Sequence, residues 1–187
     1  MRIIAGKYKG KKLLKPSDRE IRPSSDRMRE TIFSILEGGR YGNILQSKKI
    51  IDLFAGTGAL GIESISRGNP KKVVFVDNNP TAINIIKSNI QSLNIDDNRA
   101  LVLLKNAQDW GNWNYGKFEL IFSDPPYYSK LSEIALTSLV NINAIQNGAL
   151  IIVESAAKED SPKIEYFKTI EMRKIGNSKL HFLIFEY

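Results

Sequence analysis

The chain has 187 residues, of which 42% are hydrophobic and 25% are charged, and these proportions are typical of one globular domain. It contains no cysteine and one histidine, which excludes disulfides and thiolate metal sites and disfavours a histidine-built metal site or a Ser-His triad. No apolar run approaches the ~20 residues that span a bilayer, and basic residues interrupt the apolar stretches of residues 1–15, unlike in a signal peptide. We expect a cytoplasmic protein that uses no metal and has no membrane partner.

The positive charge is concentrated at the start of the chain. The net charge is +7, and residues 1–49 contain 13 Lys and Arg against 5 Asp and Glu, whereas the remainder contains 14 against 15. A basic segment on a nearly neutral body is typical of proteins that contact nucleic-acid phosphates, but a solubilising surface has the same composition. Charge alone leaves both interpretations open.

Residues 1–49 are predicted to form a small extension of the main domain. Residues 2–5 and 11–14 are expected to be two short strands of a hairpin around a turn at Tyr8–Gly10. A helix is expected to begin after the capping candidates Ser24 and Ser25, because apolar residues then recur at helical spacing until Gly38.

Residues 50–187 are predicted to form the main α/β domain. Short continuous apolar runs alternate with helical segments, which is typical of strands buried on both faces of a doubly wound, mainly parallel sheet. The end of the chain, around Gly176-Asn177, is expected to add a closing antiparallel strand pair. The expected parallel strands are 50–55, 73–76, 101–104, 118–122 and 150–153, the crossover helices are 59–67, 80–92 and 131–140, and the closing strands are 165–172 and 180–187.

The first buried strand ends in Asp52-Leu-Phe-Ala-Gly-Thr-Gly, and Gly56, Gly58 and Gly61 form the pattern G-x-G-x-x-G. Glycine lets the backbone approach a ligand closely, and Asp77, which ends the second strand, has the position of a ribose-binding acid. These features suit either NAD or S-adenosylmethionine. The carboxylate of Asp52 would repel a pyrophosphate but attract an ammonium and a sulfonium, so its charge favours S-adenosylmethionine.

The strand at 118–122 is followed by Ser-Asp124-Pro125-Pro-Tyr127. The two prolines end the strand and fix its backbone, so that the Asp124 carboxylate and the Pro125 carbonyl form two rigid acceptors at the carboxyl end of a central strand. Two acceptors match the two hydrogens of an exocyclic amine, and holding them would return lone-pair character to its nitrogen for in-line attack on a methyl group. Tyr127 offers a flat face for a base, which would have to leave any stack or duplex first.

The two segments resemble known motifs. Asp-x-Phe-x-Gly-x-Gly resembles motif I of class I methyltransferases, in which Asp77 would hold the ribose and Asn78 would lie beside the adenine, and Asp-Pro-Pro-Tyr resembles motif IV of the amino-methyltransferases. Together with Arg2-Ile-Ile-Ala-Gly, Arg22-Pro-Ser-Ser-Asp-Arg-Met-Arg-Glu-Thr-Ile-Phe33 and Ser66-Arg-Gly68, they resemble the bacterial 16S rRNA guanine-N2 methyltransferase D family along the whole chain. This resemblance implies methylation of a guanine N2 of 16S rRNA, in an assembled or assembling small subunit, by a monomer that converts S-adenosylmethionine into S-adenosylhomocysteine.

The resemblance assigns roles to three groups of residues. The catalytic residues would be Asp124, Pro125 and Tyr127, and the cofactor-binding residues would be Asp52, Phe54, Gly56, Gly58, Asp77, Asn78, Asn106 and Ala107. The basic residues expected to contact rRNA phosphates are Arg2, Lys7, Lys9, Lys11, Lys12, Arg22, Arg27 and Arg29, although Arg27 and Arg29 would instead pair with Glu30 or Glu63 on a purely structural interpretation.

Three positions depart from the family pattern: Asn106 where Asp is usual for the adenine amino group, Ile175 where an aromatic residue is common, and Thr57 in place of Ser. His181, Trp110 and Trp113 are interpreted as structural.

Two other functions are compatible with these motifs. Asp-Pro-Pro-Tyr alone permits an adenine-N6 DNA methyltransferase, although the chain leaves no room for a separate target-recognition region, and an rRNA-binding assembly factor without turnover is the second alternative.

Overall fold

A computed structural model describes residues 1–15 and 25–187. Its helices are α1 (Asp26–Glu37), α2 (Ala59–Arg67), α3 (Pro80–Ser92) and α4 (Leu131–Asn141). Its strands are β1 (Lys49–Leu53), β2 (Lys72–Asp77), β3 (Ala100–Leu104), β4 (Phe118–Ser123), β5 (Ile145–Ala156), β6 (Phe167–Ile175) and β7 (Ser178–Phe185).

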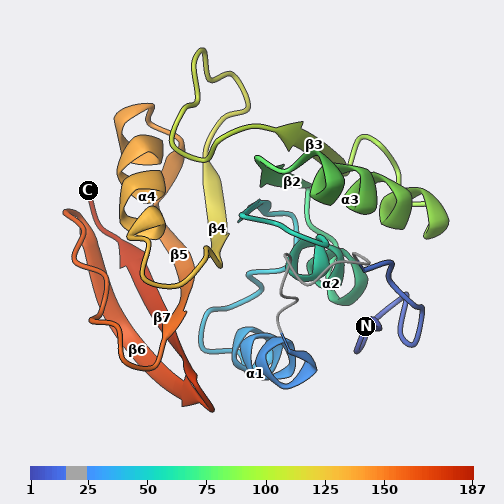
Figure 1. The fold of residues 1–187 in the computed structure, drawn as a ribbon, viewed down its shortest axis with the longest axis horizontal. Helices are drawn as coiled ribbons and strands as arrows, with labels where there is room; N and C mark the ends of the chain where they lie inside the picture. Colours follow the sequence, from blue (N-terminus) through green and yellow to red (C-terminus); the bar gives the residue numbers. More distant parts are fainter. Residues whose placement is uncertain (16–24) are drawn as a thin grey trace.

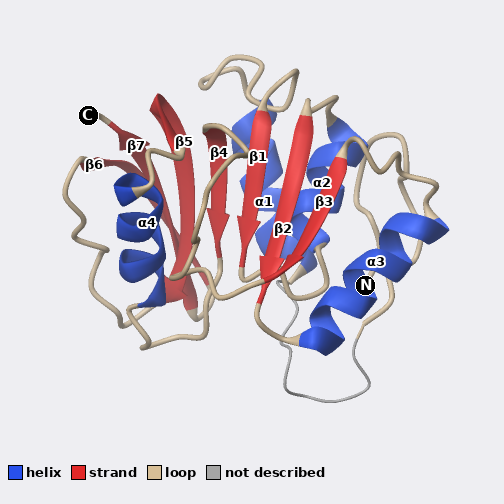
Figure 2. Ribbon diagram, turned by 90° about the horizontal axis from the view of Figure 1, so that it is seen from above, coloured by secondary structure: helices blue, strands red, loops and turns tan. Residues whose placement is uncertain are grey.

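The strands form one twisted sheet in the order β3-β2-β1-β4-β5-β7-β6 (Figure 2). Strands β1 to β5 are parallel to one another, whereas β7 is antiparallel to both β5 and β6. The strand order reverses direction between β1 and β4, and the crevice beyond the carboxyl ends of the strands at such a point is where ligands bind in open α/β sheets. The predicted α/β fold with a closing antiparallel pair is confirmed.

Two apolar cores cover the two faces of the sheet. Alternate residues of each central strand point into opposite cores, as Ile50 and Ile51 of β1 do. One core includes side chains of α1, α2 and α3, and the other includes α4 and Trp110. Figures 1 and 2 show α1 and α2 on one side of the sheet and α4 on the other. Both faces are therefore buried, which explains why the strands appear in the sequence as continuous apolar runs.

The amino-terminal arm, residues 1–15, packs along α2 and contains a shortened form of the predicted hairpin. Arg2 and Lys12 form an antiparallel β-bridge, and backbone hydrogen bonds join residues 1–3 to residues 11–13, but the pairing does not extend over the expected strands 2–5 and 11–14. The backbone N–H groups of residues 4, 5, 7 and 8 donate instead to Glu63 and Ser66 of α2. A strand ladder cannot extend where its donors are already used by another element.

Other expectations agree with the structure. Helices 59–67 and 80–92 have the predicted bounds, and Ser25 caps α1 by accepting a hydrogen bond from the N–H of Met28, while Ser24 lies outside the described residues. His181 is completely buried, with Nε2 2.9 Å from Ser155 Oγ, and Trp110 is a buried core residue. None of the helices in the described ranges has the length and apolarity of a membrane span.

Candidate functional site

A cavity of about 560 Å³ opens at the carboxyl ends of β1, β2, β4 and β5, where the sheet order predicts a ligand site. Its walls come from distant parts of the chain. The lining residues include Arg27, Asp52, Phe54, Gly56, Asp77, Asn78, Asp124, Pro125, Tyr127, Glu154 and the turn 175–178. Asp52, Phe54, Gly56, Asp77, Asn78, Asp124, Pro125 and Tyr127, all predicted from the sequence, therefore meet in one place.

The loop between β1 and α2 has the backbone conformation that its glycines allow. Gly56 and Gly58 have φ angles of 55° and 75°, in the left-handed region that favours glycine. Phe54 adopts the same region at 59°, although it has a side chain, and such a conformation persists only when its surroundings hold it in place. The Asp77 carboxylate fixes the loop by accepting a hydrogen bond of 2.8 Å from the Gly56 N–H.

Asp52 brings a buried carboxylate to the cavity wall. Its Oδ2 accepts a 2.9 Å hydrogen bond from the Gly61 N–H in the first turn of α2, and the residue is only 2% exposed. Burial raises the pKa of Asp52 well above its usual value, the Gly61 N–H opposes this shift, and the charges of Asp124 and Asp77 add to it. A cation in the cavity would relieve this accumulation of negative charge, which fits a sulfonium or an ammonium and opposes a pyrophosphate.

Asp77 is held for ligand binding at the end of β2. Its two oxygens accept hydrogen bonds of 2.8 Å each from the N–H groups of Gly56 and Asn79. A carboxylate has about four acceptor positions, so both oxygens retain capacity for the hydroxyls of a ribose. Asn78, the next residue, is exposed and also lines the cavity. These residues fit the ribose and adenine of S-adenosylmethionine.

Replacement of Asp77 by asparagine is expected to weaken binding of S-adenosylmethionine by about 10- to 100-fold, because a charge-assisted hydrogen bond is lost and the loop loses one of its ties. Isothermal titration calorimetry measures this change. Asp97→Asn, which removes the same charge from an exposed loop residue outside the cavity wall, is the matched control. Equal affinities of the Asp77→Asn variant and the wild type would contradict the role of Asp77.

The segment Asp124–Tyr127 follows β4 directly and lines the cavity. Tyr127 is half-buried, and its hydroxyl donates to Glu154 Oε1 at 2.8 Å and lies 2.7 Å from Ser178 Oγ. Burial raises the pKa of the Tyr127 hydroxyl, and the neighbouring carboxylates of Glu154 and Asp124 raise it further. The hydroxyl is therefore neutral near pH 7, and its hydrogen bonds fix the direction of the ring.

Of the predicted cofactor-binding residues, Gly58, Asn106 and Ala107 are not among the residues that line the cavity. The Asn106 side chain is exposed and accepts a 3.0 Å hydrogen bond from the Gln108 N–H, and Ala107 is buried in the core cluster that includes α4. Asn106 thus forms a local turn after β3, as asparagine commonly does. The structure does not support the predicted contacts of Asn106 and Ala107 with a ligand in this cavity.

Sequence reasoning missed three parts of the wall. The amino-terminal end of α1 contributes Ser25, Arg27 and Met28, β5 contributes Glu154, and the turn between β6 and β7 contributes residues 175–178. Glu154 directly follows the apolar run 150–153, so the rule that selected Asp124, a polar residue at the carboxyl end of a parallel strand, also selects Glu154. No sequence pattern indicates that the amino-terminal end of α1 and the turn between β6 and β7 complete the wall of the cavity.

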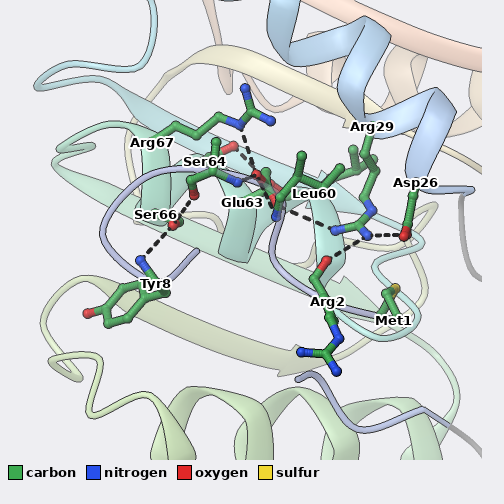
Figure 3. Close-up of polar contacts among 12 residues, drawn as sticks. Met1, Arg2, Tyr8, Asp26, Arg29, Leu60, Glu63, Ser64, Ser66 and Arg67 are labelled. Atoms are coloured by element: carbon green, nitrogen blue, oxygen red, sulfur yellow. Dashed lines mark hydrogen bonds and ion pairs between the residues drawn. The ribbon is translucent and has the colours of Figure 1, made fainter. Parts of the chain in front are cut away.

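Arg29 does not lie on the basic surface as predicted. Its guanidinium is completely buried and contacts Glu63 Oε2 at 3.4 Å, Asp26 Oδ1 at 2.6 Å and the Arg2 carbonyl at 2.9 Å (Figure 3). Glu63 also binds Arg67 at 2.8 Å and accepts hydrogen bonds from the N–H groups of Ile4 and Ala5. Arg29 is thus a structural link between α1, α2 and the amino-terminal arm, and its predicted contact with RNA is wrong because no part of its side chain reaches solvent.

The other predicted basic residues are exposed where the structure describes them. Arg27 stands at the cavity wall, while Arg22 lies outside the described residues. The predicted basic residues of the arm, all exposed, are Arg2, Lys7, Lys9, Lys11 and Lys12. These side chains, called here the basic surface of the arm, belong to a segment that lies next to α2 (Figure 1).

The sheet order, the glycine loop, the acid at the end of β2 and Asp-Pro-Pro-Tyr at the end of β4 together define a class I methyltransferase. Residues 1–184 match the family described as "Conserved hypothetical protein 95". The chain is 35% identical over 166 residues to ribosomal RNA small subunit methyltransferase D of Haemophilus influenzae, covering 88% of this chain and 82% of the relative. It is 29% identical over 176 residues to the protein of that name in Escherichia coli K12, with coverages of 94% and 85%.

A solved structure supports the same relationship. The fold superimposes on the Escherichia coli protein yhhF with a TM-score of 0.85 at 27% identity, covering 100% of this chain and 98% of that one. The chain therefore belongs to the ribosomal RNA small subunit methyltransferase D family, and it is a methyltransferase.

Proposed function

We propose that the protein transfers a methyl group from S-adenosylmethionine to the exocyclic N2 of a guanine in 16S rRNA. The observation that carries the proposal is one cavity lined both by Asp124 and Pro125, which follow β4, and by Asp52, Gly56 and Asp77, which lie at the ends of β1 and β2. The names of the relatives in Haemophilus influenzae and Escherichia coli support small-subunit ribosomal RNA as the substrate. The proposed substrate places the reaction in the cytoplasm, where ribosomes assemble.

Each acceptor has a defined task in this reaction. S-adenosylmethionine, when bound, supplies a methyl group on a positively charged sulfur, and its product is S-adenosylhomocysteine. The Asp124 carboxylate and the Pro125 carbonyl accept the two hydrogens of the guanine amine, which draws the nitrogen lone pair out of conjugation and aligns it. The proton that the methylated nitrogen sheds passes to Asp124 or to water. Tyr127, fixed by Glu154 and Ser178, provides the face on which the base stacks.

The basic surface of the amino-terminal arm is proposed to bind rRNA phosphates, so the first 49 residues would form the RNA-contacting part of the enzyme and residues 50–187 the catalytic part. Lys9, Lys11 and Lys12 are exposed on the arm, and Arg27 is an exposed basic residue that lines the cavity. Phosphate contacts position a substrate without reading its sequence. The arm would thus orient the RNA while the cavity selects the base.

A triple Lys9→Gln, Lys11→Gln, Lys12→Gln variant is expected to flatten the dependence of log K on log salt by about 2 to 3 units, because each phosphate contact contributes roughly 0.7 to 0.9. Filter binding of 16S rRNA at several salt concentrations measures the slope. The control replaces Lys87, Lys117 and Lys168, three exposed lysines on other elements, and should keep the wild-type slope. An unchanged slope in the arm variant would show that the arm does not contact phosphates.

Radiolabelled S-adenosylmethionine, offered to small subunits that lack their natural methylation, tests the proposed function. The expected product after nucleoside digestion is N2-methylguanosine in 16S rRNA. Label in N6-methyladenosine, with duplex DNA as the better substrate, would instead establish a DNA methyltransferase. Binding of both rRNA and cofactor without any label transfer would indicate an assembly factor.

A further inference from the structure

The half of the cavity that lies beyond the cofactor residues contains a second carboxylate beside Asp124. In the parallel pair β4 and β5, Ser123 is in register with Val153, so Asp124 and Glu154 are the next residues on two adjacent strands. Neighbouring strands lie about 4.8 Å apart, and both residues line the same cavity. The sheet therefore presents two acidic side chains next to each other, facing the place where the acceptor base must lie.

Glu154 is a nearly buried residue that is only partly used by the protein. It is 9% exposed, and its Oε1 accepts the 2.8 Å hydrogen bond from the Tyr127 hydroxyl. That hydroxyl is held from its other side by Ser178 Oγ at 2.7 Å, so the direction of the Glu154 carboxylate is fixed between β5 and β7. No described residue forms a hydrogen bond with Glu154 Oε2, which leaves this oxygen available as an acceptor for a ligand in the cavity.

We propose that Glu154 is a specificity-determining residue that accepts the N1–H of the target guanine. This inference rests on the proposed function and adds the reason for its base preference. Guanine carries two adjacent donors, N1–H and the N2 amine, on one edge. Asp124 and the Pro125 carbonyl take the amine, and Glu154, one strand further along the sheet, takes N1–H.

The same pair of acids disfavours the other bases that carry an exocyclic amine. In adenine and in cytosine, the ring nitrogen next to the amine is an unprotonated acceptor, so its lone pair would face the Glu154 carboxylate. The Glu154 carboxylate would then lack a hydrogen-bond donor, and its oxygen would repel the lone pair of the ring nitrogen. An adenine could therefore place its amine at Asp124 only by leaving Glu154 Oε2 without a partner.

The test compares two target nucleosides in small subunits reconstituted with ligated 16S rRNA: guanosine, and 2-aminopurine riboside at the methylated position. 2-Aminopurine retains the 2-amine but has an unprotonated N1. Wild-type enzyme is expected to methylate guanosine about 10- to 100-fold faster than 2-aminopurine, the range for one hydrogen bond to a charged group. In Glu154→Gln, whose amide donates as well as accepts, this rate ratio should fall by at least about tenfold.

Tyr127→Phe is the matched control, because it removes the hydroxyl that binds Glu154 Oε1 but keeps the Glu154 side chain and its free oxygen Oε2. Its overall rate can fall, but its ratio of guanosine to 2-aminopurine should stay within about threefold of the wild-type ratio. A ratio that collapses equally in Tyr127→Phe and Glu154→Gln would overturn direct recognition and would make Glu154 a residue that only positions Tyr127.

The wild-type enzyme alone also decides the matter if Glu154→Gln does not fold. Wild type that methylates guanosine and 2-aminopurine at similar rates overturns the inference and leaves the proposed function intact. Wild type that methylates neither nucleoside, with cofactor binding confirmed by calorimetry, overturns the proposed function together with the inference.

Discussion

Replacement of Asp124 by alanine is expected to lower the rate of methyl transfer by about 10²- to 10³-fold or more, while the protein folds and binds S-adenosylmethionine. The loss follows from the proposed role of Asp124, which lies directly after β4 and lines the cavity, as an acceptor for the guanine amine. Removing a preorganised group that acts on the reacting atoms has effects of this size. Transfer of radiolabelled methyl groups to small subunits, measured under single-turnover conditions, gives the rate.

Asp124→Asn separates two roles of the same side chain. Asparagine keeps an acceptor oxygen but cannot take a proton at neutral pH. If Asp124 only holds the amine, Asp124→Asn should retain more activity than Asp124→Ala. If it also receives the proton, both variants should fall to the same level. The exposed Asp160 supplies the control replacement Asp160→Ala, and full activity of Asp124→Ala would refute the assignment of Asp124.

The second large effect concerns stability. Glu63→Ala is expected to lower the free energy of unfolding by about 3 to 5 kcal/mol, because it leaves the completely buried Arg29 guanidinium without its partner on α2. It also removes the acceptor for the N–H groups of Ile4 and Ala5, which attach the amino-terminal arm. For a chain of this length, the melting temperature should fall by roughly 10 °C.

Thermal and urea unfolding followed by circular dichroism measure this change. Glu37→Ala is the matched control, because Glu37 is a 45% exposed carboxylate that binds the same Arg67 at 2.8 Å. An exposed ion pair contributes less than about 1 kcal/mol, so Glu37→Ala should leave the melting temperature nearly unchanged. Equal effects of the two replacements would mean that the buried contacts of Glu63 do not hold the arm.

The fold was largely predictable because each core strand is buried on both faces and each crossover helix has its own periodicity. Residues 59–67 and 80–92 show this, since glycine or proline marks their starts. Strand β5 is longer than its apolar run 150–153 because its first part, Ile145–Gly148, is mostly exposed and joins β4 through a register shift. Apolar content therefore locates the middle of such a strand but not its ends.

The residues of the candidate site that lie at the ends of strands were predictable from the sequence. Those whose position depends on tertiary packing were not. Asp52, Asp77 and Asp124 all lie at carboxyl ends of parallel strands, which a sequence pattern indicates. Helical spacing from Ile32, Phe33 and Leu36 places Arg29 on the buried face of α1, but a charged side chain is not expected there without its partner Glu63, 34 residues further along the chain. For the same reason, the amino-terminal end of α1 and the turn between β6 and β7 were not recognised as walls of the cavity.

The cavity wall includes the turn between β6 and β7, which lies more than 110 residues along the chain from the glycine loop. Ser178 at this turn contacts the Tyr127 hydroxyl at 2.7 Å, so the outermost strand pair of the sheet helps to hold a side chain that follows the central strand β4. Substitutions that loosen the packing of β6 and β7 are therefore expected to disturb the cavity although they lie outside the parallel part of the sheet.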